Sequence, residues 1–344
     1  MLSFLVTSDW HLEAMKKHFP EDHLERQFSS LDRIYQYALT KGITHIIIPG
    51  DISDRQKMDD ETKARLLHFF MKYEGIIESH YIGGNHDWAD ATATSMDLIN
   101  QFCDWKFLKS LHVYMKPKQV KIEGITVNML PHPARASIKS KKPALNFCHV
   151  EASGAKGDNG RLLKVKKDIA VHEDDFTISG HLHMYQYLKK KRFLFGGAPY
   201  QKTFGESRPK GFLECSAKYK NGKLIVKHDF VTLKPNYQLD TVSISRQKDW
   251  SKLEVNPSIR YRVYVDDGVT VPADIRTRIP NIAQILGMGH GGKDLDVSRI
   301  NVDHIGEFEV EPLNGLKDWL KTSGLKIPLQ KLALKEAEKV RATF

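Results

Sequence analysis

The stretch HIIIPGD, residues 45–51, joins a β-branched run directly to a glycine and a carboxylate. Such a run is typical of a strand that is buried on both faces, and the polar residue after it stands at the strand's carboxyl end. The arrangement recurs after the apolar residues 4–6, 81–82, 145–147 and 176–178. Ligand sites in open α/β sheets lie outside the carboxyl ends of strands, where loops converge. We therefore predict an α/β fold in which five loops meet at one site.

The loops after these strands are rich in side chains that bind metals. They supply Asp9, His11, Asp51, Asn85, His86, Asp87, His149, His181 and His183. Mn, Fe, Zn and Co accept mixed carboxylate and imidazole ligands, and two such ions about 3.5–4 Å apart can clamp a phosphate and activate a water. A lone D-x-H or H-x-H pair is more often a surface or core feature. The whole set in this order predicts a two-metal phosphoesterase site, and neighbouring glycines such as Gly50 and Gly84 permit the close backbone approach that it needs.

The order D-x-H, G-D, G-N-H-D, H and G-H-x-H resembles that of the calcineurin-like metallophosphoesterases. The resemblance implies a four-layer αββα sandwich that binds two divalent ions, which we expect to be Mn. It assigns Asp9, His11 and His183 to one ion, Asp51 to a bridging position, and Asn85, His149 and His181 to the other ion. It also implies that a protonated His86 steadies the leaving oxygen while an activated water attacks phosphorus, and that Asp87 orients His86.

The segment from Gly197 to Glu206 resembles the G-S-P-x-x-x-x-F-x-E segment of SbcD-type recombination and repair nucleases, with Ala198 where Ser is usual. Residues 50–55 also fit the G-D-x-x-D-R of protein serine/threonine phosphatases, but those proteins carry Glu where this chain has Asp87. The first resemblance implies an exonuclease on duplex DNA ends and an endonuclease on single strands or hairpins. Two alternatives stay open: a phosphatase or cyclic phosphodiesterase for small substrates, and a DNA-binding scaffold with a vestigial site.

The charge of the chain agrees with a nucleic-acid substrate. The net charge is +10, and residues 1–239 hold 36 Lys and Arg against 27 Asp and Glu, so nearly all of the surplus lies there. The surplus is concentrated in three clusters, one of which is Lys164, Lys166 and Lys167. We predict that the other two contact DNA, because basic clusters can follow a phosphate backbone. They are Lys139, Lys141 and Lys142, and the run Lys189, Lys190, Lys191 and Arg192. A solvated loop face is the alternative.

The chain divides into three expected parts: a catalytic domain over residues 1–239, a small α+β capping domain over 240–312, and a helical segment over 313–344. Pro235 interrupts a strand-like run before the first boundary. In the capping domain we predict a strand at 260–265, a helix at 272–286 and a strand at 297–302. This module resembles the cap by which SbcD-type nucleases grip DNA.

The last segment carries an apolar stripe at helical spacing, beginning near Pro328. The family resemblance implies that this helix docks on the coiled-coil base of an SbcC-like, SMC-type ATPase, and it also allows a homodimer. Packing back on the domain is the alternative.

Three cysteines without C-x-x-C spacing indicate a reducing compartment and no disulfide framework. No stretch of the sequence is long and apolar enough for a membrane span or a signal peptide. We expect a cytoplasmic protein. Its length is similar to that of bacteriophage members of the nuclease group, for which the compartment would be the host cytoplasm.

Overall fold

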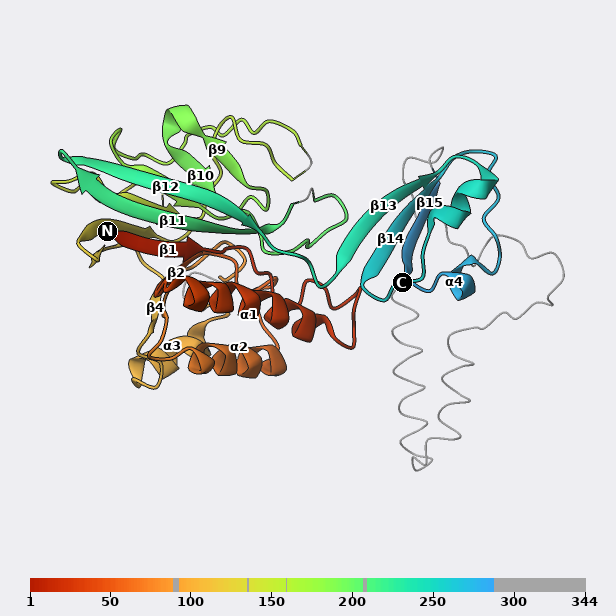
Figure 1. Cartoon of the computed structure of the whole chain (residues 1–344), viewed down its shortest axis with the longest axis horizontal. Coiled ribbons are helices and arrows are strands. Elements are labelled where there is room, and N and C mark those ends of the chain that lie inside the picture. The colour runs from red at the N-terminus through yellow and green to blue at the C-terminus, as the bar shows by residue number, and fades with distance from the viewer. Residues whose placement is uncertain (89–92, 135, 159, 207–208, 288–344) are drawn as a thin grey trace, which may run out of the picture. The chain divides into compact units, whose positions relative to one another are not determined.

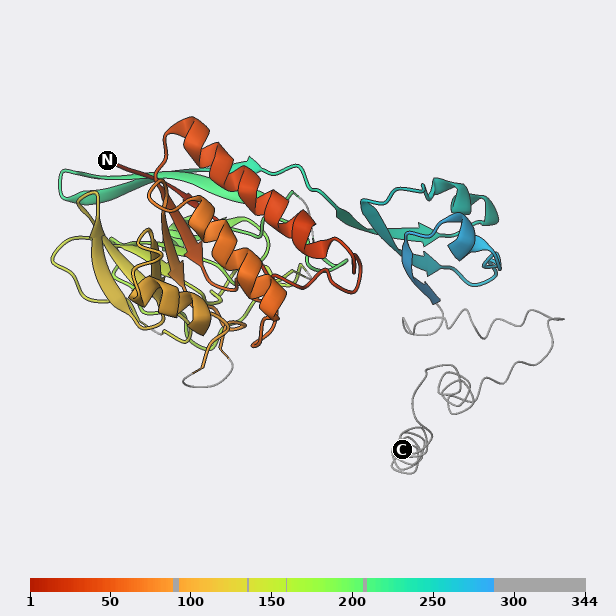
Figure 2. The same ribbon diagram turned by 90° about the horizontal axis from the view of Figure 1, so that it is seen from below.

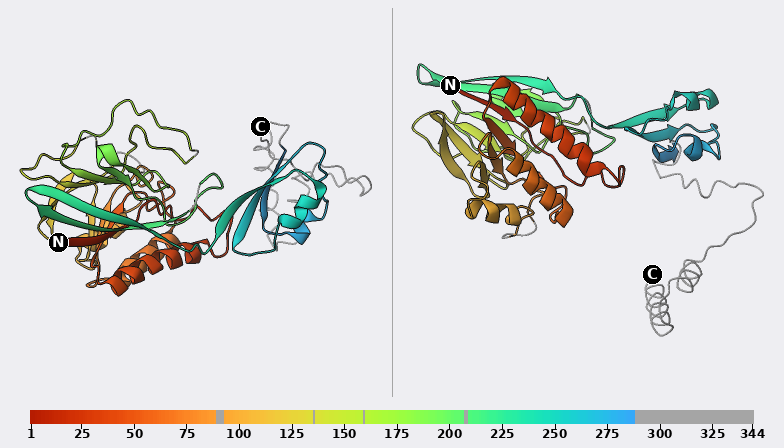
Figure 3. Two further views of the ribbon diagram at one scale, coloured as in Figure 1. Left: turned by 45° about the horizontal axis from the view of Figure 1, so that its top comes forward. Right: turned by 60° about the horizontal axis from the view of Figure 1, so that its bottom comes forward.

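Two mixed six-stranded sheets make up the predicted catalytic domain (Figure 1). The computed structural model describes residues 1–88, 93–134, 136–158, 160–206 and 209–287. The strands of the first sheet are β1 (Leu2–Val6), β2 (His45–Pro49), β3 (Glu78–Ile82), β4 (Leu111–Tyr114), β11 (Gly211–Lys220) and β12 (Lys223–Thr232). Their order is β12-β11-β1-β2-β3-β4, and β1 to β4 run parallel. The β11–β12 hairpin closes one edge and is seen in both views of Figure 3.

The second sheet is built in the same way around a parallel centre. Its strands are β5 (Lys118–Ile122), β6 (Ile125–Leu130), β7 (Leu145–Cys148), β8 (Phe176–Ser179), β9 (Gln186–Leu188) and β10 (Phe193–Phe195). They lie in the order β5-β6-β7-β8-β10-β9, with β6, β7, β8 and β10 parallel. All five strand segments predicted to precede the site are confirmed, as parts of β1, β2, β3, β7 and β8. The α/β sandwich is confirmed with them.

Apolar side chains from facing strands fill the space between the two sheets. Phe4 of β1 meets Phe147 of β7 edge to face, with ring centroids 5.8 Å apart. The outer face of the first sheet is covered by α1 (His23–Lys41), α2 (Asp60–Lys72) and α3 (Asp97–Asp104), which lie in front of the strands in Figure 2. Trp10, which is fully buried, packs between this sheet and the aromatic side chains of α2.

The outer face of the second sheet differs from the expected helical layer. In the described part of the chain it is covered by loops, whose apolar residues such as Val150, Ala152 and Ile169 pack against Cys148 and Phe195. Apart from the short 3-10 turn η1 (Lys189–Lys191), no helix is found in the described residues between 131 and 210. The four-layer expectation therefore holds for three layers, and loops supply the fourth.

The described part of the predicted capping domain is a parallel three-stranded sheet, β13 (Gln238–Ile244), β14 (Ile259–Val265) and β15 (Ile282–Gly287). Two short elements accompany it, the 3-10 turn η2 (Gln247–Lys252) and the helix α4 (Ile275–Arg278). The predicted boundary after residue 239 falls inside β13. The predicted strand at 297–302 and the segment 313–344 lie outside the described residues.

The helix predicted over 272–286 is wrong, because helical structure is confined to the four residues of α4. Pro280 disfavours a helical backbone at the residue before it and offers no N–H to continue a helix. Ile282 and Ile285 then pair with Tyr261 and Val263 of β14.

Among the described residues, no helix is both long enough and apolar enough to cross a membrane.

Candidate metal centre

The loops that follow β1, β2, β3, β7 and β8 meet at one edge of the sandwich. Backbone hydrogen bonds fix the first two to each other: the amide of Asp9 donates to the carbonyl oxygen of Gly50 at 3.0 Å, and that of His11 donates to Asp51 at 3.0 Å. Parallel strands end at the same edge, so these loops deliver their polar side chains to one place. The structure brings together there all seven side chains predicted to be ligands.

The first group consists of Asp9, His11 and His183, whose ligand atoms lie within 4.8 Å of one another. The two Nε2 atoms of His11 and His183 are 3.1 Å apart, and His183 Nε2 is 4.0 Å from Asp9 Oδ1. Two imidazole nitrogens at this distance must share a proton or a cation. This is the set predicted for one ion.

The second group is centred on the amide oxygen of Asn85. That Oδ1 atom lies 3.0 Å from Nε2 of His149 and 3.0 Å from Nδ1 of His181. The other nitrogen of His149, Nδ1, donates to the carbonyl oxygen of Pro49 at 2.8 Å, which leaves Nε2 as the ligand atom. This is the set predicted for the other ion.

Asp51 lies between the two groups. Its Oδ2 atom is 3.2 Å from His149 Nε2 and 3.6 Å from His11 Nε2. Burial favours the neutral acid, but His149 and His11 outweigh it and hold the pKa of Asp51 well below its usual value. Burial likewise lowers the pKa of His149, and Asp51 outweighs burial so that this pKa is about 9. The position suits the bridging carboxylate that the sequence predicts.

The donor set and its spacing fit divalent metals. Nitrogens bound to one ion at about 2.1 Å and at right angles would lie about 3 Å apart, which is close to the separation of His11 and His183 Nε2. Carboxylate, imidazole and amide oxygen donors suit borderline divalent ions. Several neighbouring clusters could therefore hold metal, and Asp9 contributes to two of them.

The backbone of the site is held in an unusual conformation. Asp9, His11, Asp51 and His181 have φ values of 56°, 40°, 54° and 79°. Non-glycine residues rarely adopt the left-handed region, and those that do cluster at functional sites, at a cost of about 1–3 kcal/mol each. Four of the seven predicted ligands thus share a left-handed backbone conformation that the sequence pattern did not predict.

Glycines allow the loops to approach closely. A Cβ atom on Gly84 would lie 2.1 Å from Asp51 Oδ1, and one on Gly50 would lie 2.1 Å from His149 Nδ1. No side chain fits at either place. The close approach predicted for these glycines is confirmed.

His86 and Asp87 play different parts in the structure. The Nδ1 atom of His86 donates to the carbonyl oxygen of Asp54 at 2.8 Å, and the His86 ring meets the His11 ring edge to face. Asp87 is fully buried and accepts from the amides of Asp51, Ser53 and Gly84 at 2.8–3.1 Å. The contact that orients the His86 ring is therefore with Asp54, whereas Asp87 ties the loops after β2 and β3 together.

Four further carboxylates reach histidines of the centre without having been predicted as site residues, and one of them, Glu151, lies 3.4 Å from Nε2 of His181. Asp158 Oδ2 and Glu206 Oε1 lie 3.0 and 3.3 Å from Nδ1 of His183, and Asp54 Oδ1 lies 3.5 Å from Nδ1 of His11. Burial lowers the pKa of His183, but the two carboxylates outweigh it and raise that pKa to about 10. Asp54 and Glu206 stand in segments whose family resemblance was noted, whereas nothing in the sequence singles out Asp158.

The lysine clusters lie at the other end of the strands. The turn η1 precedes β10, and β10 runs parallel to β8 with Phe193 opposite Thr177, so Lys189 and Lys190 stand near the start of β8 rather than at its ligand-bearing end. Lys139, Lys141 and Lys142 are exposed and likewise precede β7. These lysines are therefore close to the ligands in sequence, but they lie away from the ligand-bearing edge in the structure.

Two members of the second cluster already have partners within the chain. Lys191 pairs with the carboxylate of Asp168 and donates to the carbonyl oxygen of Ser153. Arg192 donates to the carbonyl oxygens of Asp175 and Leu224, each at 2.9 Å. Lys189 and Lys190 are exposed.

Comparison with protein families identifies the family of the chain. A family model for calcineurin-like phosphoesterases matches residues 2–185, which is more than half of the 344 residues. The matched range contains every predicted ligand as well as His86 and Asp87. No curated protein matches the chain.

Proposed function

The chain belongs to the calcineurin-like phosphoesterase family, and we propose from this premise that its metal-dependent phosphoester hydrolysis acts on DNA. The proposed enzyme is a nuclease of the SbcD kind with two divalent ions, Mn by preference. It would act on duplex ends and on single strands or hairpins during recombination and repair.

The observation that carries this proposal is the position of the segment from Gly197 to Glu206, whose resemblance to SbcD-type nucleases is the most specific in the chain. Lys202 Nζ lies 2.9 Å from Asp54 Oδ1 and 3.2 Å from His11 Nδ1, so the segment reaches the candidate metal centre. A segment tied to a nuclease subgroup thus contacts the groups that would carry out the chemistry.

When bound, the two ions would polarise the phosphate and lower the pKa of a water. His86 supplies the proton chemistry of the chain. Because its Nδ1 donates to Asp54, the other nitrogen, Nε2, is the one that can hold a proton for the leaving oxygen. The loop of His86 is held against the loop of Asp51 by Asp87, which accepts from the amides of Asp51 and Ser53, and by the His86 amide, which donates to Asp51 Oδ1.

The test compares a polymer with small esters. Purified full-length chain would be assayed with Mn on 3′-labelled duplex DNA and on circular single-stranded DNA, beside p-nitrophenyl phosphate monoesters and diesters. We expect DNA degradation to exceed small-ester turnover greatly. Efficient turnover of the small esters with intact DNA would favour a small-substrate phosphatase or phosphodiesterase instead, and inactivity on every substrate despite bound metal would favour a scaffold.

We also propose that the chain works with an SbcC-like, SMC-type ATPase through its last segment. The segment lies outside the described residues, and the support for this partner is the apolar stripe at helical spacing after Pro328.

A further inference from the structure

The two histidines of the first group have the same kind of neighbours on the side away from the other ligands. Each presents Nε2 to the centre, and near its Nδ1 lies the oxygen of a carboxylate that is paired with a lysine. At His183 a second carboxylate, Asp158, also lies 3.0 Å from Nδ1. Both lysines, Lys202 and Lys210, come from the segment that directly follows β10. This segment lies beyond the range that the family model matches.

At His183 the arrangement is buried. Glu206 Oε1 is 3.3 Å from His183 Nδ1, and Glu206 Oε2 is 2.6 Å from Lys210 Nζ. The side chains of Glu206 and Lys210 are only 1% and 3% exposed. Lys210 also donates to the carbonyl oxygen of His183 at 2.8 Å, so the pair contacts both the ring and the backbone of this histidine.

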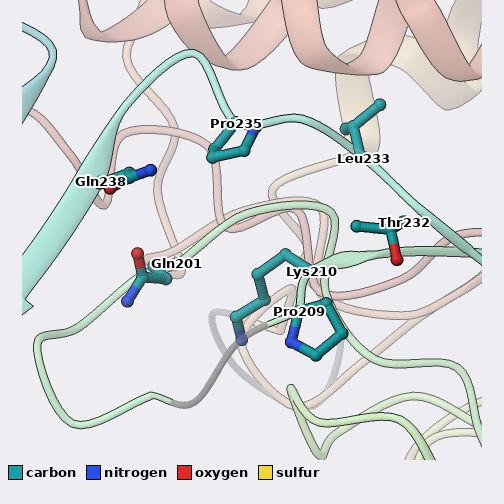
Figure 4. Close-up of a pocket in the computed structure, with 7 residues that line it drawn as sticks. All are labelled: Gln201, Pro209, Lys210, Thr232, Leu233, Pro235 and Gln238. Atoms are coloured by element: carbon teal, nitrogen blue, oxygen red, sulfur yellow. The ribbon is translucent and has the colours of Figure 1, made fainter.

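The backbone of the same segment locks Glu206 in turn. Its Oε1 atom accepts from the amides of Lys202 and Thr203 at 3.1 and 2.9 Å. Lys210 stands beside Gln201 and Pro209 in a cavity of about 310 Å³ (Figure 4). The Lys210 side chain is nevertheless almost fully buried, and its charged end contacts Glu206.

At His11 the arrangement is looser. Asp54 Oδ1 lies 3.5 Å from His11 Nδ1 and 2.9 Å from Lys202 Nζ. The side chains of Asp54 and Lys202 are 19% and 21% exposed. Each of these two histidines thus has a carboxylate–lysine pair beside Nδ1, and the pairs differ in burial; Lys202 Nζ also lies 3.2 Å from His11 Nδ1, and Asp158 adds a second carboxylate at His183.

The described residues of this segment give no such support to the histidines of the second group. His149 Nδ1 donates to the backbone carbonyl of Pro49, and His181 Nε2 lies 3.4 Å from Glu151, whose side chain is 47% exposed. The two groups of ligands therefore differ in the side chains and backbone groups that contact the outer ring nitrogens of their histidines.

We propose that Glu206, together with Lys202 and Lys210, sets the affinity of one of the two metal sites, that of Asp9, His11 and His183, with Glu206 as the positioning residue for His183. A carboxylate on the outer nitrogen of a ligand histidine fixes its tautomer and ring orientation, and losing it costs 10- to 100-fold in metal affinity. The inference rests on the two-ion assignment of the proposed function, but not on DNA as the substrate.

The experiment measures Mn binding to the full-length chain by isothermal titration calorimetry, with metal content checked after desalting. Glu206→Gln should weaken one of the two ions about 10- to 100-fold and leave the other unchanged. Because this substitution would leave the buried Lys210 without its anion, the double variant Glu206→Gln/Lys210→Met is measured beside it, with thermal unfolding of both metal-free proteins. Glu151→Gln, a carboxylate beside the other group, is the matched control and should not weaken the same ion.

Two backgrounds identify the ion. In His149→Ala the effect of Glu206→Gln on the remaining ion should persist, whereas in His183→Ala it should vanish, since the ligand that Glu206 positions is gone. Equal weakening of both ions, or unchanged affinity in a folded Glu206→Gln/Lys210→Met protein, would overturn the proposal. Because no DNA is present, a wild-type chain that binds two ions but leaves DNA intact would refute only the proposed substrate.

Discussion

At the scale of single residues, the centre depends on contacts that leave no room for an added atom. Gly84 approaches Asp51 so closely that its own backbone amide and that of Asp51 share one acceptor, Asp87 Oδ2, at 2.8 and 2.9 Å. The same closeness places the Asp51 carboxylate where it can reach both groups of ligands. A substitution at Gly84 therefore tests whether the site depends on backbone approach or on its side chains alone.

Gly84→Ala should lower metal content and hydrolysis more than 10-fold, because its Cβ would meet Asp51 Oδ1 at 2.1 Å and the Asp51 amide at 2.4 Å. Overpacking of this kind typically costs about 1–3 kcal/mol. Bound metal by mass spectrometry and the thermal midpoint would be measured. Gly205→Ala is the matched control, because a Cβ there would meet only Thr203 Oγ1, at 3.9 Å. Normal metal binding by Gly84→Ala would show that the loop can shift.

His86→Asn should lower the hydrolysis rate about 100- to 10,000-fold, the usual worth of a general acid, while metal content stays nearly intact. His86 is held through Nδ1 by a backbone carbonyl and is assigned no ligand role. His181→Ala is the contrasting variant and should lower bound metal directly. Loss of metal from His86→Asn would instead make His86 a ligand, as its closeness to His11 and Asp54 allows.

The ligands could be predicted from sequence because each follows a strand that its own residues identify. The supporting carboxylates could not, since Glu206 and Asp158 reach His183 from segments 23 and 25 residues away in sequence. Glu206 stands four residues before its partner Lys210, but that spacing does not show that the pair contacts His183. The motif around Glu206 was visible as a resemblance, but only folding shows what it contacts.

At the scale of secondary-structure elements, apolar runs that end in a turn predicted strands well, because such runs have few other stable environments. The prediction of a helix over 272–286 was wrong because isoleucines at 275, 279 and 282 fit the period of one long helix as well as they fit a short helix followed by a strand. Pro280 distinguishes these alternatives, because a proline disfavours a helical backbone at the residue before it. The helix prediction did not take this effect into account.

A second feature at this scale is a row of histidines across three neighbouring strands. His45 Nδ1 of β2 lies 3.4 Å from His80 Nε2 of β3, and the His80 ring stacks on that of His112 in β4 with centroids 4.6 Å apart. Tyr114 contacts His80 from β4, and Glu78 contacts His112. Burial lowers the pKa of His45, and the charge of Glu123, in the turn after β5, partly offsets this effect.

Acid should destabilise the catalytic domain through His80. Burial, with His112 and His45 beside it, lowers the pKa of His80 to about 3. The folded state then binds fewer protons than the unfolded state, whose histidine has a pKa near 6.5, so stability is full above pH 6.5 and falls as pH drops toward 3. Between pH 6.5 and 5 the loss from this group is up to about 1.5 kcal/mol.

The measurement is urea unfolding at pH 7.5, 6.5 and 5. His80→Gln should show a flatter dependence on pH than the wild type, whereas His172→Gln, at an exposed histidine outside the row, should follow the wild type. Parallel curves for wild type and His80→Gln would mean that the row takes up protons without cost.

At the scale of the whole molecule, the lysine clusters predicted to contact DNA and the candidate metal centre lie at opposite ends of the parallel strands. Lys189 and Lys190 stand near the start of β8, and His181 and His183 follow its end. A polyanion that reaches both must therefore extend along the sandwich. A small phosphate ester could not, so the lysines separate the two substrate classes.

Lys189→Ala/Lys190→Ala should weaken binding to all DNA sequences alike and lower the salt slope by about 0.9 for each duplex phosphate that is no longer neutralised. Turnover at saturating DNA should stay unchanged, because this cluster stands away from the ligand-bearing edge. Binding would be measured by fluorescence anisotropy at low and at physiological salt. Lys63→Ala removes a lysine of α2 that is paired with Asp60 and serves as the control. An unaltered slope would reduce the cluster to a solvated turn.

The last segment should serve partner binding rather than the catalytic domain. The described part already provides the two sheets, their covering helices and all the predicted ligands, so truncation before Leu325 should leave a folded, metal-loaded enzyme with its thermal midpoint nearly unchanged. The apolar stripe from Leu329 to Val340 would then matter only to the partner, and the truncated chain should fail to co-purify with the coiled-coil ATPase that retains the full-length chain. A fall in the thermal midpoint of more than about 5 °C, the scale of a 1–2 kcal/mol loss, together with new protease sites in the catalytic domain, would instead make the stripe part of the core.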